Sequence, residues 1–74
     1  MALISTSCEG WSLNRISRGA PFHVEEVGPL RLPQVCDKLG AVALSGPEGA
    51  VFCGSIDQAE LLCSMANSGE LEVL

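Results

Sequence analysis

Positive charge is scarce in this sequence. The 74 residues include four lysines or arginines against nine aspartates or glutamates, which gives a net charge of −5. A protein that binds nucleic acid replaces phosphate counterions with clustered basic side chains, so direct nucleic-acid binding is disfavoured. The acidic residues are scattered, as on a solvated surface, and such a surface can also bind a basic protein partner.

Long apolar runs and targeting signals are also missing. No uncharged run is longer than that from Leu39 to Pro47, whereas a membrane-spanning helix needs about 20 apolar residues. Residues 1–8 lack the basic start and the apolar stretch of a secretory signal peptide. We therefore predict a cytoplasmic protein without membrane partners.

The usual spacing of metal ligands is absent. The four cysteines are Cys8, Cys36, Cys53 and Cys63, with no C-x-x-C pair, and His23 is the one histidine. Structural zinc sites are usually built from close cysteine pairs, so we predict neither a metal nor another cofactor. Disulfides would need an oxidising compartment. Cys53 and Cys63 instead fit the role of small core residues.

Apolar content is what the sequence has in excess. The chain is 47% hydrophobic with a mean hydropathy of +0.34, and its length suits one domain over residues 1–74. A domain of this size buries only about 60% of the surface of its unfolded chain and usually needs a staple or an oligomer. We expect a homodimer.

Residues 40–69 form the most structured stretch. Residues 41–44 and 50–53 are apolar runs of strand length, separated by a loop with two glycines and a proline. This arrangement predicts a hairpin over residues 41–53. Neither run alternates with polar residues, so both faces of the hairpin are expected to be covered.

A helix is predicted over residues 57–67. Asp57 is a suitable N-cap, Glu60 completes a capping box, and Gly69 can form a left-handed C-cap. The helix should pack its apolar stripe on the hairpin. The stripe contains Ala59, Leu61, Leu62, Cys63, Met65 and Ala66.

Short strands are expected in the remainder of the chain. In residues 22–27, alternation places Phe22 and Val24 on one face and His23 and Glu25 on the other. Residues 34–39 read either as a helical turn or as a loop. The whole is a small α+β fold with a mostly antiparallel sheet and one principal helix. Further strands are predicted over residues 2–7, 11–18, 30–32 and 70–74.

The stretch Gly49-Ala50-Val51-Phe52-Cys53-Gly54, followed by Ile56-Asp57, resembles the YunC-like domain-of-unknown-function family. The similar features are a glycine turn, an apolar strand ending in Cys-Gly, and then an aliphatic residue and Asp. Upstream, residues 28–33 are similar to the strand ending in Leu-Pro that precedes this hairpin. The resemblance covers residues 28–66. It implies an α+β fold, supplies no mechanism, and directs attention to Cys53.

Cys53 and His23 are the candidate catalytic residues. Cys53 precedes a predicted helix, whose N-terminal amides would lower a thiol pKa, and a partnership with His23 would make it a nucleophile. Asp57 opposes that effect by its charge, and burial beside apolar neighbours would raise the pKa. His23, near Glu25 and Glu26, could act as a base oriented by a carboxylate.

Two functional classes follow. The favoured one is a non-enzymatic interaction or regulatory protein of the accessory or inhibitor type. It would form a homodimer and bind another protein through an apolar face or the acidic surface. The alternative is a small cysteine-dependent enzyme or thiol sensor that uses Cys53; whether the protein is an enzyme stays open. The candidate contact residues are Trp11, Glu60, Leu71, Glu72 and Val73.

Overall fold

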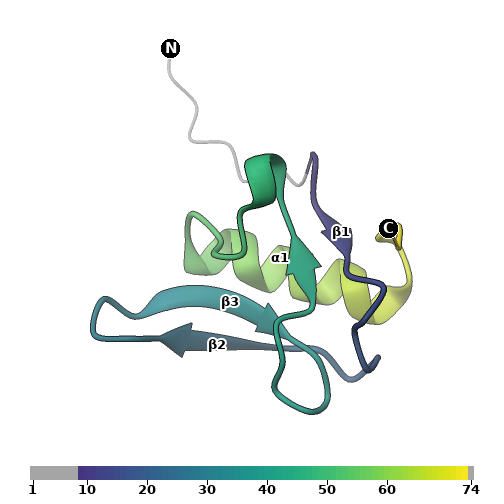
Figure 1. The fold of residues 1–74 in the computed structure, drawn as a ribbon, viewed down its shortest axis with the longest axis horizontal. Helices are drawn as coiled ribbons and strands as arrows, with labels where there is room; N and C mark the ends of the chain where they lie inside the picture. Colours follow the sequence, from purple (N-terminus) through teal and green to yellow (C-terminus); the bar gives the residue numbers. More distant parts are fainter. Residues whose placement is uncertain (1–8, 74) are drawn as a thin grey trace.

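The computed structural model describes residues 9–73 as two small antiparallel sheets and one long helix (Figure 1). The predicted α+β class is confirmed. No helix in this range is long and apolar enough to cross a membrane. The elements are β1 (Ser12–Leu13), β2 (His23–Val27), β3 (Leu32–Cys36), β4 (Leu44–Ser45), a 3₁₀ turn (Pro47–Gly49) and α1 (Ile56–Ser68). The strand predicted over residues 2–7 lies outside the described residues.

β2 and β3 form the principal hairpin, in register from His23 opposite Cys36 to Val27 opposite Leu32. Residues 28–31 make the turn, and the Arg31 amide donates to the Gly28 carbonyl at 3.1 Å. Pro33 is accommodated because its carbonyl points away from β2, where it accepts from the Cys53 amide at 2.8 Å. Its missing N–H is therefore not needed by the β2–β3 ladder. The segment predicted over residues 30–32 is instead the end of the turn and the start of β3.

Residues 42–45 connect the two sheets. Val42 forms a bridge with Cys36, and the Ala43 amide donates to the Val35 carbonyl at 3.0 Å. β4 then pairs with β1 in antiparallel register. On its other side, β1 receives the chain end through a parallel bridge between Leu13 and Val73. The strands expected over residues 11–18 and 70–74 are thus much shorter than predicted.

The hairpin predicted over residues 41–53 is wrong, because its two apolar runs do not pair with each other. β4 takes β1 as its partner, so the run at residues 50–53 is left outside the sheets. The Gly46 amide still bonds the Ala50 carbonyl at 2.7 Å, and the chain then turns away toward Pro33. The Trp11 ring packs directly on Gly46, since a Cβ atom at Gly46 would lie 2.6 Å from it. Val51 and Phe52 are consequently exposed, not covered on both faces.

α1 extends the predicted helix by one residue at each end. Its N-cap is Ser55, whose hydroxyl accepts from the Gln58 amide at 3.1 Å, while the Gln58 side chain accepts from the Gly54 amide at 2.6 Å. The prediction of Asp57 as the cap is therefore wrong. Asp57 lies in the first turn, where its negative charge interacts favourably with the helix dipole. Gly69 forms the predicted left-handed C-cap with φ 82°.

The core lies between α1, the β2–β3 hairpin and β4. α1 buries the side chains of Ala59, Leu62 and Ala66, whose spacing defines one stripe of the helix. Leu61 lies off this stripe and is 42% exposed, so the prediction that it packs inward is wrong. The largest apolar side chains that are fully buried are Val35, Leu44 and Leu62.

Asp37 directly follows β3 and holds the turn after it closed. Its buried carboxylate accepts from the backbone amides of Arg18, Leu39 and Ala41 at 2.9–3.1 Å. These hydrogen bonds lower the pKa of Asp37, and the bond from the Arg18 amide has the largest effect. The ambiguous segment over residues 34–39 is therefore the end of a strand followed by a turn.

Candidate functional site

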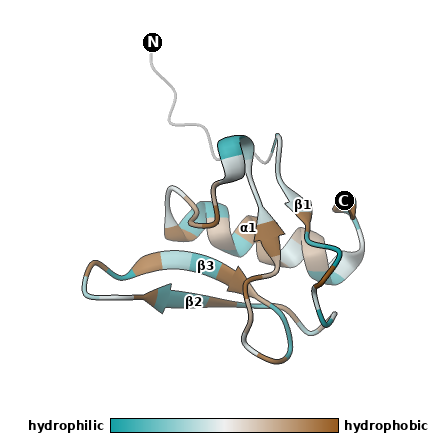
Figure 2. Cartoon of the chain, in the orientation of Figure 1, coloured by the Kyte–Doolittle hydropathy of each residue, from teal (hydrophilic) through white to brown (hydrophobic). Residues whose placement is uncertain are grey.

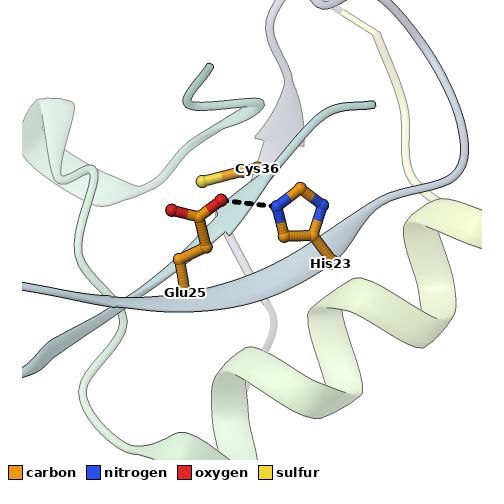
Figure 3. A group of neighbouring side chains, drawn as sticks. All are labelled: His23, Glu25 and Cys36. Atoms are coloured by element: carbon orange, nitrogen blue, oxygen red, sulfur yellow. Dashed lines mark hydrogen bonds and ion pairs between the residues drawn. The ribbon is translucent and has the colours of Figure 1, made fainter. Parts of the chain in front are cut away.

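His23, Glu25 and Cys36 lie together on one face of the β2–β3 hairpin (Figure 3). His23 and Cys36 are directly opposite each other, and Glu25 follows His23 by two residues. Side chains at such positions share a face of the sheet. The other face carries Phe22 and Val24 toward the core, as the alternation predicted.

The three side chains are close enough to act on one another. His23 Nε2 lies 2.6 Å from a Glu25 carboxylate oxygen. One nitrogen, one oxygen and the Cys36 sulfur all fall within 4.8 Å of one another. The side chains of His23 and Glu25 are 44% and 45% exposed, whereas Cys36 is 1% exposed. The group therefore opens to solvent through its imidazole and carboxylate and has its sulfur underneath.

The surroundings of Cys36 favour the neutral thiol. Burial raises its pKa, and the negative charges of Glu25 and Asp37 raise it further. The thiol contacts the Gln34 side-chain oxygen at 3.9 Å, a weak hydrogen bond. In this state Cys36 is a poor nucleophile, because the thiolate is the reactive form.

The turn after β3 borders the group. Gly40 lies beside Glu25, since a Cβ atom at Gly40 would be 3.9 Å from the Glu25 carboxylate. Asp37 holds this turn in place through its amide bonds. The site is thus supported by a paired hairpin and a fixed turn, without a cavity in the described part of the chain.

The cysteine beside His23 is Cys36, and Cys53 lies elsewhere. Cys53 is buried in the core cluster with Leu62, which confirms the burial predicted for it. Sequence reasoning missed Cys36 because it fell in the segment that was ambiguous between helix and loop. The missed signal was the four-residue turn at residues 28–31: counting outward from Val27 and Leu32 places His23 opposite Cys36.

The candidate contact residues divide into buried and exposed ones. Trp11 and Leu71 belong to the core, and at 9% exposure each they present little surface. Glu60 is exposed on α1. Glu72 and Val73 are also exposed, although their backbone pairs with β1.

A second surface feature is a group of exposed large apolar side chains, here named the apolar end. The tip of the β2–β3 hairpin supplies part of this group, and residues 51–56, up to the first residue of α1, supply the rest. The bond between the Cys53 amide and the Pro33 carbonyl places these two segments side by side. Figure 2 shows hydrophobic colouring on both. The apolar end consists of Val27, Leu30, Leu32, Val51, Phe52 and Ile56.

Comparison with known proteins finds no match to a family model, to a curated protein or to a solved structure. The resemblance to the YunC-like family accordingly stays a prediction. The two surface features that bear on function are therefore the His23–Glu25–Cys36 group and the apolar end.

Proposed function

We propose that this protein is a small non-enzymatic interaction protein that forms a homodimer through the apolar end. The observation that supports this is the exposure of large apolar side chains at one end of a chain whose core is already filled. Leu30 is 79% exposed at the hairpin tip, while Val35, Leu44 and Leu62 are fully buried. Exposed large apolar side chains that gather at one end of a protein typically mark an interaction site.

A second copy suits this surface because an exposed cationic side chain, Arg31, lies on one flank and an exposed anionic one, Asp57, on the other. Arg31 extends from the hairpin turn with its side chain 79% exposed, 3.9 Å from a Glu26 oxygen. Asp57 is exposed on the first turn of α1, next to Ile56. In a closed two-fold dimer each surface meets its own copy, so Arg31 of one protomer can face Asp57 of the other.

The dimer would leave the acidic surface available to a basic protein partner. Glu60 and Glu72 are exposed outside the apolar end, and the net charge is −5. The alternative of a cysteine-dependent enzyme has less support. Cys53 is buried in the core, and Cys36 has a raised pKa.

Two aspartate substitutions test the proposal. Leu30 and Ile16 are 79% and 78% exposed, but only Leu30 belongs to the apolar end. We expect sedimentation equilibrium at micromolar concentration to give a dimer for the wild type and for Ile16→Asp, and a monomer for Leu30→Asp. Circular dichroism should be the same for all three, since both positions face solvent. A monomeric wild type, or equal loss of association in both variants, would overturn the proposal.

A further inference from the structure

The His23–Glu25–Cys36 group has the composition of a metal site. It brings together an imidazole nitrogen, a carboxylate oxygen and a sulfur within 4.8 Å, from two directly paired strands. We propose that this group binds one Zn²⁺ ion with three protein ligands and a fourth position open to solvent. Nitrogen, oxygen and sulfur are the ligands that zinc accepts, and a three-residue set with an open position is typical of its non-structural sites.

The distances suit one ion after small side-chain movements. Zinc bonds of about 2.0–2.3 Å in a tetrahedral arrangement place neighbouring ligand atoms roughly 3.3–3.6 Å apart. The imidazole and carboxylate are now 2.6 Å apart, so an ion between them would move them apart by about 0.7 Å. The same ion would draw them toward the sulfur, since the three ligand atoms now span up to 4.8 Å. Rotation of the half-exposed His23 and Glu25 side chains can supply this movement, while the hairpin register fixes the three Cα positions.

The charge of the site also suits a divalent cation. On binding, the Cys36 thiol releases its proton to solvent and a sulfur–zinc bond forms. The thiolate and the Glu25 carboxylate together neutralise the two positive charges of the ion. Asp37 adds a further carboxylate directly after Cys36, and the whole chain is acidic. A cation at this face therefore relieves repulsion between the negative groups.

Gln34 provides a second group around the sulfur. Its side-chain oxygen lies 3.9 Å from Cys36 Sγ and now accepts from the thiol. Turning the amide by half a rotation would present its NH₂ group to the thiolate of the zinc-bound state. Such hydrogen bonds to a ligand atom orient the ligand and tune the metal. The fourth position faces solvent beside His23 and Glu25, where water or a small thiol or carboxylate compound can bind the ion.

Cobalt substitution tests the site directly. A sulfur ligand gives Co²⁺ a near-ultraviolet charge-transfer band, and added Zn²⁺ should abolish that band as it displaces the cobalt. We expect one equivalent of Co²⁺ to bind the wild type. The band should be lost in Cys36→Ser and retained in Cys63→Ser, the matched control on α1. Affinity should fall at least about tenfold in His23→Gln and in Glu25→Gln.

The His23 and Glu25 variants keep the test valid if Cys36→Ser unfolds, because their side chains are half exposed. Absence of the band in the wild type would overturn the proposal. A band that survives in Cys36→Ser would show that another cysteine binds the metal. Wild-type affinity in both His23→Gln and Glu25→Gln would show a cysteine that binds cobalt without these partners.

Discussion

At the scale of single residues, short polar side chains fix the backbone where the sheets and the helix meet. Asp37 accepts from three amides in two segments, and Asn67 attaches the end of α1 to the start of β2. Neither role follows from sequence, since both depend on backbone groups that approach only in the folded chain. In the sequence, Asn67 is simply the last residue of the helix predicted over residues 57–67.

Asp37 should make the stability of the folded protein decrease at acid pH. Its pKa is lowered in the folded protein, first by the hydrogen bond from the Arg18 amide, so the folded state binds its proton less readily than the unfolded state. The contribution of the carboxylate is therefore complete above the unfolded pKa of about 3.9 and is lost as pH falls toward the folded value. Urea unfolding of Asp37→Asn should show a lower midpoint at pH 7 and a smaller difference between pH 7 and pH 3 than the wild type. An unchanged midpoint at pH 7 would contradict this role.

Asn67 pairs with both polar groups of the Phe22 backbone. Its side-chain oxygen accepts from the Phe22 amide at 2.8 Å, and its NH₂ group donates to the Phe22 carbonyl at 3.1 Å. Asn67→Ala should lower the free energy of unfolding by about 1–3 kcal/mol, because two hydrogen bonds are lost. Ser64→Ala, at an exposed position of the same helix, serves as the control. Equal denaturation midpoints for the two variants would exclude the proposed role of Asn67.

At the scale of elements, local signals predicted α1 well and strand pairing poorly. The helix is determined by its own stripe and by Gly69, which are readable within about a dozen residues. Strand pairing is a choice between distant partners. The run at residues 41–44 could pair forward with residues 50–53, but β4 pairs instead with β1, near the chain start. The sequence alone does not distinguish these partners, since residues 11–18 and residues 50–53 are both predicted strands.

The same limit applies to the candidate site. Alternation in β2 correctly placed His23 and Glu25 on one face, because that relation is local. The third member, Cys36, required the β2–β3 register. Pro33 lies between the predicted strand over residues 30–32 and the ambiguous segment over residues 34–39. Its outward-facing backbone lets β3 continue through it to Cys36.

The packing of α1 gives a prediction for the helix. Leu62 is fully buried, whereas the adjacent Leu61 is largely exposed. Leu62→Ala should reduce the free energy of unfolding by about 2–4 kcal/mol, and Leu61→Ala by less than about 1 kcal/mol. The pair is matched in chemistry and differs only in helix face, so chemical denaturation separates burial from helix propensity. Similar losses in both variants would show that the stripe is assigned to the wrong face.

At the scale of the whole molecule, a filled core and an exposed apolar end coexist in 74 residues. The sequence suggested self-association from apolar excess, and three of the candidate contact residues, Leu71, Glu72 and Val73, lie in the predicted terminal strand. Part of this terminal stretch is already paired within the chain, because Val73 bridges Leu13. The exposed surface lies instead at the β2–β3 turn and before α1, which is where the dimer is now proposed.

The location of that contact is tested most directly by the concentration dependence of amide NMR spectra. On dilution through the micromolar range, amide signals from residues 27–32 and 51–57 should shift as the dimer dissociates. Signals from residues 11–18, which contain the equally exposed Ile16, should stay unchanged. Spectra that do not change with concentration, or shifts confined to residues 11–18, would contradict a dimer formed through the apolar end.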